Sequence, residues 1–227
     1  LKWLFNSRYY KYKKQKNRER ELMSGKLKWL LITLLLSSSA AWSAATPQEV
    51  VKATADSVID HIESNRHILE TDPEKIFEMV NELVIPRFDF ISMSKWVLGK
   101  HWKTASESQR NEFVTQFKSL LIRTYARALL EYSGQQIKYF PVKQNPNSNL
   151  AVVKTELTSK SSAQLPILYR MHQKNQEWKV VDVAVDGVSL VTTYRGSFST
   201  QIKKDGFDSL LDQLTKKNIR LENNISN

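Results

Sequence analysis

The chain contains no cysteine among its 227 residues. A protein without cysteine has no disulfide bonds, no thiol nucleophile and no thiolate ligands, so its stability depends on its apolar core. Glycine and histidine are also scarce, with six and four residues. The glycines form no phosphate-binding loop, and the histidines show no metal-ligand spacing. We therefore predict neither a metal site nor a cofactor.

Motifs for nucleophilic or acid–base catalysis are missing as well. Ser189 in Gly187-Val-Ser-Leu190 lacks the second glycine of a nucleophile elbow. Asp182 and Asp186 are four residues apart on a predicted strand, a separation of about 13 Å, which is too long for one shared site. The plainer interpretation places Asp182 at a strand edge and makes Asp186 a helix N-cap. We predict no catalytic residues.

Acidic residues are few in one part of the chain only. The formal net charge is +11, but residues 1–45 hold ten Lys and Arg against two Glu. Residues 46–227 hold 24 basic and 21 acidic residues, which is nearly balanced. A nucleic-acid-binding domain carries a basic stripe on its fold, and the sequence shows none. We predict no nucleic-acid partner.

Residues 23–45 have the pattern of a secretory signal peptide. A short basic start precedes the apolar run Trp29–Leu36, and the small-residue segment Ser37–Ala45 follows it. The apolar run is too short for the ~20 residues of a membrane-spanning helix. We predict export by a cleavable signal peptide, with an uncleaved anchor as the alternative. We interpret residues 1–22 as a non-native extension ahead of a start at Met23, with a genuine basic tail as the alternative.

Helical periodicity dominates residues 46–134. Ser106 begins the longest predicted helix as an N-cap, and Gln109 is its capping-box partner. A glycine-containing aromatic corner, Gly99–Trp102, precedes it. The predicted helices cover residues 46–69, 72–86, a short stretch between 86 and 98, and 106–134.

Strand periodicity follows, in four runs joined by short loops, as in an antiparallel meander. Val181, Val183 and Val185 are expected on the same face of the last strand. Helical patterns then return, and residues 219–227 form a polar, flexible tail. The predicted strands cover residues 135–141, 150–157, 164–173 and 178–185, and the last helices cover residues 188–203 and 206–217.

This order of elements predicts an α+β fold, with one curved, mainly antiparallel four-stranded sheet covered by about six helices. No linker or repeat interrupts residues 46–218, which we interpret as one domain. Apolar side chains surround much of the longest helix, with Phe113 and Phe117 on one face and Val114 and Ile122 beside it. Such a helix packs on two sides or lines an apolar cavity. The sequence leaves a filled core and a hollow one as alternatives.

Two long blocks carry a family resemblance. The first is V-L-G-K-H-W-K-T-A-S-E-S-Q-R at 97–110, and the second is W-K-V-V-D-V-A-V-D-G-V-S-L-V-T-T-Y-R at 178–195. They resemble the MlaC family, also called the toluene-tolerance or Ttg2-type family, of periplasmic phospholipid-binding proteins. The resemblance runs in order through the expected domain. Gly196 departs slightly from it, because we expect a polar residue there.

The resemblance implies a soluble periplasmic phospholipid carrier with no enzymatic step, which maintains outer-membrane lipid asymmetry. Two partners are implied besides the glycerophospholipid itself. One is an inner-membrane ABC transporter complex with an MCE-domain ring, and the other is an outer-membrane lipoprotein–porin complex. The lipid is cargo and not a cofactor, its acyl chains lie in an apolar pocket, and the protein is expected to be a monomer.

On this interpretation, apolar side chains from the helices and the sheet line the lipid pocket. Arg170 and Arg195 are candidates for contact with the head group, each with a structural ion pair as the alternative. The candidate lipid-binding residues are Trp96, Val97, Phe117, Leu121, Tyr125, Val153, Ile167, Tyr169, Met171, Val181, Val183, Val188, Leu190, Val191 and Tyr194.

Two other functions fit the same residues. A small enzyme with a cupped sheet would use Asp182 or His172 as an acid or base. A periplasmic chaperone-like module would bind peptides on the same apolar surface. Phospholipid bound to the purified protein would distinguish a carrier from both alternatives.

Overall fold

The structure is a computed structural model that describes residues 45–72, 74–142, 148–158 and 164–223. The predicted upstream extension and the signal-peptide segment up to residue 44 lie outside these residues, as does the end of the predicted tail. The described residues belong to one compact unit. None of their helices is long and apolar enough to span a membrane.

The first described helix, α2 (Pro47–Ser64), begins at a capping box. The Thr46 hydroxyl accepts a hydrogen bond from the Glu49 N–H, and the Glu49 carboxylate accepts one from the Thr46 N–H. The helix ends at Asn65, whose side-chain amide donates to a carbonyl of the last turn and competes with the helical backbone. The prediction of one helix to residue 69 is therefore wrong, and a short helix, α3 (Arg66–Thr71), follows.

The predicted helix over residues 72–86 is divided into three short segments. They are the α-helix α4 (Lys75–Met79), the π-helical segment η1 (Val80–Val84) and the 3-10 segment η2 (Ile85–Arg87). Pro86 lacks a backbone N–H and its ring clashes with the preceding turn, so an α-helix does not continue through it. Helical geometry is therefore irregular over residues 80–87.

The short and long helices predicted between residues 86 and 134 are both present. The capping box of Ser106 and Gln109 is confirmed, with both of its hydrogen bonds formed. The predicted corner forms one helical turn after Gly99, which has a φ of +54°. The elements are α5 (Phe90–Leu98), α6 (His101–Thr104), α7 (Glu107–Tyr125) and the 3-10 segment η3 (Ala126–Glu131).

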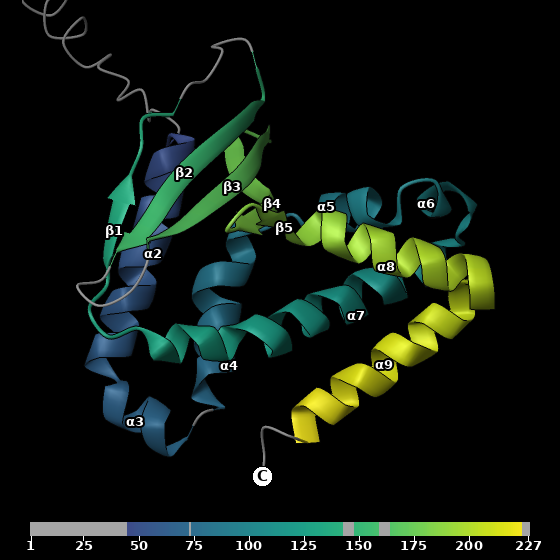
Figure 1. Cartoon of the computed structure of the whole chain (residues 1–227), viewed down its shortest axis with the longest axis horizontal. Coiled ribbons are helices and arrows are strands. Elements are labelled where there is room, and N and C mark those ends of the chain that lie inside the picture. Colours follow the sequence, from purple (N-terminus) through teal and green to yellow (C-terminus); the bar gives the residue numbers. More distant parts are fainter. Residues whose placement is uncertain (1–44, 73, 143–147, 159–163, 224–227) are drawn as a thin grey trace, which may run out of the picture. The chain divides into compact units, whose positions relative to one another are not determined.

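The four predicted strands are consecutive antiparallel neighbours, and a short fifth strand follows them. Asn175 and Gln176 form a two-residue turn in which both residues have positive φ, which suits the twist of the strands it joins. Figure 1 shows α2 running along this sheet. The strands are β1 (Gln136–Tyr139), β2 (Leu150–Thr158), β3 (Leu165–Lys174), β4 (Glu177–Val185) and β5 (Val188–Ser189).

The fifth strand corrects two predictions, the four-stranded sheet and the start of the next helix. Val188 and Ser189 pair with the end of β4, so helix α8 (Leu190–Asp205) begins two residues later than expected. Ser189 is its N-cap, and its hydroxyl accepts a hydrogen bond from the Thr192 N–H. Asp186, the predicted N-cap, lies in the preceding turn with a φ of +49°.

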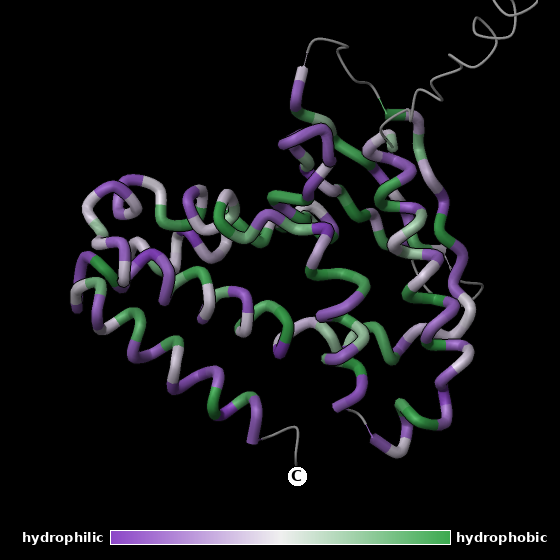
Figure 2. The backbone as a smooth tube through the Cα atoms, turned by 180° about the vertical axis from the view of Figure 1, so that it is seen from behind, coloured by the Kyte–Doolittle hydropathy of each residue, from purple (hydrophilic) through white to green (hydrophobic). Residues whose placement is uncertain are grey.

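The last helix, α9 (Phe207–Asn223), continues past its predicted end at residue 217. Leu221 packs partly buried against the core, which explains why this segment is helical and not part of a tail. Hydrophobic and hydrophilic residues alternate along α9 in Figure 2, as expected for a helix with one buried face.

The first of three apolar clusters, here called the helical cluster, lies among α5, α7, α8 and α9. The rings of Phe113, Phe117 and Phe198 contact one another at centroid separations of 5.5 to 6.1 Å. Edge-to-face and stacked rings at these separations add to the stability that area burial gives. The buried members are Met93, Val97, Leu98, Phe113, Phe117, Leu120, Leu121, Val181, Val191, Phe198, Leu210 and Leu214.

The other two clusters both include residues of α2. We call them together the sheet-side layer. The α2–α4 cluster contains Val58, Ile62, Leu69, Ile76, Met79, Val80 and Ala126. The sheet cluster contains Val51, Ala151, Val153, Met171, Trp178 and Val180.

One β-bulge places Val181 and Val183, which regular alternation would put on the same face of β4, in different clusters. Met171 of β3 faces both Val180 and Val181 of β4, so the regular alternation of β4 is broken there. Val180 is buried in the sheet cluster and Val181 in the helical cluster. Val183 packs against the sheet cluster. The prediction that Val181 and Val183 share one face is therefore wrong.

Candidate functional site

The predicted lipid-binding residues fall mainly into two of the apolar clusters. Trp96, Tyr125 and Val188 lie in neither, with exposed fractions of 39%, 43% and 60%. Ile167 and Leu190 are half-buried. The helical cluster holds Val97, Phe117, Leu121, Val181, Val191 and Tyr194, and the sheet cluster holds Val153, Tyr169, Met171 and Val183.

The sheet-side layer is where the sheet and the helices enclose apolar side chains between them. On β2, Ala151, Val153 and Thr155 are buried while their neighbours are more exposed, as the alternation predicts. On the helical side many apolar residues are only partly buried. These are Phe77, Leu83, Val84, Ile85, Ile122, Leu129, Leu130 and Tyr132.

Irregular helical segments supply much of the helical side of this layer. Leu83 and Val84 belong to the π-helical η1, Ile85 to η2, and Leu129 and Leu130 to η3. The hydrogen-bond geometry of 3-10 helices is poorer than that of α-helices. Turns of π-helix are rare in proteins, and those that occur are often found at functional sites.

Two tyrosines bring hydroxyl groups into the layer from β1 and β3. Burial, with smaller contributions from Asp56 and Tyr169, raises the pKa of Tyr139 to about 12. Burial also raises the pKa of Tyr169. The hydroxyl oxygen of Tyr139 is buried without a hydrogen-bond partner among the described residues. An unpaired buried hydroxyl costs about 1–3 kcal/mol, which a polar ligand atom would offset.

A pocket of about 470 Å³ opens between the start of α5, α7 and the turn that joins β3 to β4. The rings of Phe88 and Phe90 stack in its wall at 5.7 Å. None of the predicted lipid-binding residues lines it. The lining residues are Ile85, Phe88, Asp89, Phe90, Ile91, Val114, Thr115, Lys118, Lys174, Asn175, Glu177 and Lys179.

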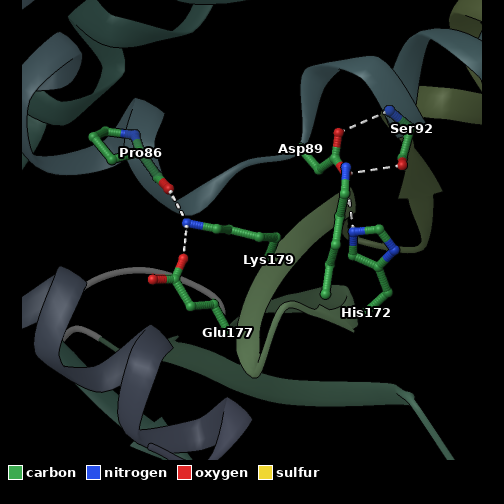
Figure 3. Close-up of polar contacts among 7 residues, drawn as sticks. Pro86, Asp89, Ser92, His172, Glu177 and Lys179 are labelled. Atoms are coloured by element: carbon green, nitrogen blue, oxygen red, sulfur yellow. Dashed lines mark hydrogen bonds and ion pairs between the residues drawn. The ribbon is translucent and has the colours of Figure 1, made fainter.

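Asp89 joins the sheet to the start of α5 (Figure 3). Its carboxylate accepts hydrogen bonds from the N–H and the hydroxyl of Ser92, both at 2.9 Å. His172 Nε2 lies 3.1 Å from the same carboxylate and Lys174 Nζ 3.2 Å from it. Burial alone would raise the pKa of Asp89, but the hydrogen bonds from Ser92 and Lys174 lower that pKa to about 2. Asp89 is therefore ionised at neutral pH.

A second link ties β4 to the irregular segment η2. Lys179 donates a hydrogen bond of 2.9 Å to the Pro86 carbonyl and pairs with Glu177 at 2.7 Å (Figure 3). The backbone N–H of Asp89 also donates to the Val180 carbonyl at 3.0 Å. These contacts fix the position at which the chain passes from η2 into α5.

Asp182 has a similar role at the start of α8. Its buried carboxylate accepts hydrogen bonds from the Ser189 hydroxyl at 2.7 Å and from the Val191 N–H at 3.1 Å, and it pairs with Arg170. The Arg170 side chain is 47% exposed. Asp182 lies within β4 and holds the N-terminus of α8, the role that the sequence assigned to Asp186. The structural ion pair foreseen for Arg170 is formed.

Arg195, the other head-group candidate, is an exposed residue of α8. Its guanidinium lies against Gly99, where an added Cβ atom would be 3.1 Å from Nη2. The side chain therefore covers the corner between α5 and α6, away from the sheet cluster.

The polar groups of these centres are engaged in holding secondary structure. Asp182 and His172, the candidate acid–base residues, are bonded to the start of α8 and to Asp89. In the described part of the chain, no group of three or more His, Asp and Glu side chains is placed to hold a metal ion. What the arrangement offers is an apolar layer between a sheet and short, irregular helical segments.

Comparison with known proteins assigns a family. The sequence model described as "MlaC protein" matches residues 52–216, well over half of the chain. This chain belongs to the MlaC family. The resemblance carried by the two sequence blocks is thereby confirmed.

Relatives in the MlaC family carry consistent names. The toluene tolerance protein ttg2D of Pseudomonas putida is 28% identical over 180 residues, which span 79% of this chain and 83% of that protein. The intermembrane phospholipid transport system binding protein MlaC of Haemophilus influenzae is 26% identical over 187 residues, 81% of this chain and 87% of that protein.

A solved structure similar to this one is that of the phospholipid-binding protein from Ralstonia solanacearum in complex with a phospholipid. It is 30% identical to this chain, with a TM-score of 0.73. The comparison covers 78% of this chain and 99% of that one. The α+β fold described above is therefore the fold of a protein solved with phospholipid bound.

Sequence reasoning missed the Asp89 centre. Asp89 precedes Ser92 by three residues at the start of an apolar helix, which is an N-cap signal that was available. Its partners His172 and Lys174 lie more than 80 residues away on β3. No local pattern reports contacts of that range.

Proposed function

We propose that this protein is a periplasmic phospholipid carrier that binds the acyl chains of a glycerophospholipid and performs no catalytic step. It would move lipid between an inner-membrane MCE-domain ABC transporter complex and an outer-membrane lipoprotein–porin complex, and so maintain outer-membrane lipid asymmetry. One observation supports this most strongly: the similar solved structure, matched over 99% of its length, holds a phospholipid.

Burial of hydrocarbon gives the physical reason for such a carrier. Each CH₂ group exposed to water costs ~0.8 kcal/mol, so a diacyl lipid does not cross an aqueous compartment unaided. A carrier needs a large apolar interior and little other chemistry. The chain fits this need, because its polar centres at Asp89 and Asp182 hold helix N-termini and leave the sheet-side layer apolar.

We place the acyl chains in the sheet-side layer, between the inward face of the sheet and the segments η1 and η3. Val153, Tyr169, Met171 and Val183 of the predicted set face this layer. The partly buried apolar residues of the α2–α4 cluster would complete the pocket when η1 and η3 move outward. The unpaired hydroxyl of Tyr139 would then bond an ester oxygen of the lipid.

Native mass spectrometry tests the proposal. Residues 46–227 are purified without detergent, and the intact protein is weighed before and after extraction with organic solvent. We expect a mass addition that extraction removes and that lipid analysis identifies as a glycerophospholipid with two acyl chains. Protein that is lipid-free, and that takes up no lipid when mixed with phospholipid vesicles, would refute the proposal.

The location in the periplasm rests on the sequence pattern of residues 23–45, which we propose is a cleaved signal peptide. Fractionation of cells that express the whole chain tests it. We expect the protein in the periplasmic fraction, at a mass reduced by removal of the residues up to the cleavage site. Retention of the full-length chain in the cytoplasm would refute this part of the proposal.

A further inference from the structure

Two segments without any acidic residue lie next to each other in the fold. Residues 90–106 contain three lysines and residues 187–204 contain one arginine and two lysines, and neither segment contains Asp or Glu. The first segment forms α5 and α6 and the second forms most of α8. Helices α5 and α8 pack on each other, and α6 lies beside them (Figure 1). The fold thus joins two basic stretches about 100 positions apart.

The cations of these segments are carried by adjacent helices, and we call them together the basic face. All are exposed, and none forms an ion pair within the described part of the chain. The basic face consists of Lys95, Lys100, Lys103, Arg195, Lys203 and Lys204.

Direct contacts show that the basic face is continuous across the helices. Arg195 of α8 lies against Gly99 at the end of α5. The Nε2 atom of His101 in α6 is 3.4 Å from the Ser199 hydroxyl oxygen in α8. Burial, together with the charges of Lys100 and Lys203, lowers the pKa of His101, as expected where cations from two helices meet.

Exposed apolar side chains stand beside these cations. Ile91 is 49% exposed and Trp96 is 39% exposed, while Met93 and Val97 on the same helix are fully buried. At 3.6 residues per turn, Ile91, Lys95 and Trp96 fall on the outward side of α5. Helix faces that combine apolar or tryptophan side chains with lysines are typical of surfaces that bind anionic membranes.

We infer that the basic face is a docking surface for anionic phospholipid bilayers. Lysine and arginine clusters bind such bilayers by charge complementarity, and an exposed tryptophan enters the interface between water and lipid. Five of the six cations are lysines. Because lysine is depleted at protein–protein interfaces and abundant at membrane-binding surfaces, this composition favours a membrane over an acidic partner protein.

This surface would serve the proposed function but does not depend on it. A carrier that touches a bilayer loosely gains access to lipid, whereas the acyl chains themselves would be held at the sheet-side layer. Binding to the bilayer would be reversible, because salt screens the attraction and no long apolar segment inserts.

Vesicle co-sedimentation of residues 46–227 tests the inference. All members of the three apolar clusters lie within residues 50–221, so this part has its own core. Vesicles of phosphatidylethanolamine with phosphatidylglycerol are compared with vesicles of phosphatidylcholine alone. We expect sedimentation with the anionic vesicles only, and its loss at high NaCl concentration.

Variants then locate the binding surface. Each basic side chain near an anionic surface changes binding roughly fivefold, so replacing Lys100, Lys103 and Lys203 with Gln should weaken it by about 100-fold. Trp96→Ser should weaken binding further. A matched control replaces Lys52, Lys75 and Lys216, whose side chains are 56%, 44% and 66% exposed, with Gln and gives the same net charge.

We expect the control triple variant to bind within a few-fold of the wild type. Equal loss in both triple variants would overturn the inference, because binding would then follow net charge alone. Absence of sedimentation with either vesicle, or equal sedimentation with both, would also overturn it. Native mass spectrometry of each variant keeps the two proposals apart. Protein that sediments but is lipid-free and takes up no lipid from vesicles would refute carriage alone, and lipid-loaded protein that does not sediment would refute docking alone.

Discussion

The helical cluster is closed by aromatic rings, whereas the sheet-side layer is bounded by short and irregular helical segments. In the first, Phe113, Phe117 and Phe198 form mutual ring contacts among four regular helices. In the second, the π-helical segment η1 and the 3-10 segment η3 lie against the α2–α4 cluster. The two regions therefore differ in their aromatic content and in the regularity of the helices that bound them.

Because of this difference, we expect one region to stabilise the fold and the other to bind a ligand. A close-packed cluster loses stability when any large side chain is removed, because the cavity left behind does not collapse completely. We expect the sheet-side layer, which is bounded by the short, irregular segments η1 and η3, to rearrange around an added or a missing group. The helical cluster is therefore expected to stabilise the fold, and the sheet-side layer to accommodate a ligand.

The largest effect is expected from Phe113→Ala in the helical cluster. Phe113 is fully buried and contacts three aromatic rings, so its truncation should lower the free energy of unfolding by about 4 kcal/mol. Urea denaturation followed by tryptophan fluorescence measures this. Phe140→Ala, which removes a half-buried ring beneath Lys138 and Lys154, is the control and should cost no more than about 1 kcal/mol. Equal losses in the free energy of unfolding would contradict the expectation that the helical cluster stabilises the fold more than a half-buried ring does.

Two tryptophan substitutions compare the regions directly. Leu121→Trp overpacks the helical cluster and should cost about 1–3 kcal/mol without reducing bound lipid. Val183→Trp fills the sheet-side layer and should reduce bound lipid at a cost below about 1 kcal/mol. Urea denaturation and native mass spectrometry of both variants provide the measurement. Loss of lipid in Leu121→Trp alone would place the acyl chains in the helical cluster.

Acidification tests the contacts of Asp89, which connect the sheet to the start of α5. Because the folded pKa of Asp89 is about 2, below the ordinary value of 3.8, its ionised form stabilises the fold above about pH 5. This stabilisation, about 2 kcal/mol, is lost as the pH falls towards 2. Asp89→Asn should therefore be less stable than the wild type at pH 7, and the gap should narrow on acidification. Asp56→Asn, at an exposed ion pair with Lys52, should show almost no gap at either pH.

The smallest effect is expected at two glycines next to residues of the basic face. Gly99→Ala forces an alanine to a φ of +54° and brings its Cβ to 3.1 Å from the Arg195 guanidinium, so it should destabilise by about 1–2 kcal/mol. Gly196→Ala lies in α8 with nothing within 4 Å and should stabilise by up to about 1 kcal/mol. Thermal unfolding of both variants decides the matter. If both substitutions raised the thermal stability, the backbone conformation at Gly99 would not require glycine.

Local rules predicted the elements that local contacts determine. The capping boxes at Thr46 and Ser106 and the four main strands follow from short patterns, and the structure has them. The break at Asn65 and the two-residue β5 were missed, because each depends on one competing hydrogen bond or one pairing partner. The two sequence blocks identified the family, since they are far longer than any single motif.

The candidate site was harder to predict, because it depends on contacts between distant segments. Val153 of β2, a predicted lipid-binding residue, is buried in the sheet cluster, but the bulge in β4 reversed the expectation for Val181. The sequence also showed no basic stripe, since residues 90–106 and 187–204 are brought together only by the packing of α5 on α8. Net charge counted along the chain does not report that arrangement.

The bulge at Val181 also constrains how the protein can evolve. One extra residue lets Val181 and Val183, two positions apart on a single strand, enter two separate apolar clusters. An insertion or deletion here would move every later residue of β4 to the other face, including the Asp182 that holds α8. Point substitutions can accumulate in one cluster without affecting the other. A change in the length of β4 would alter both clusters at once.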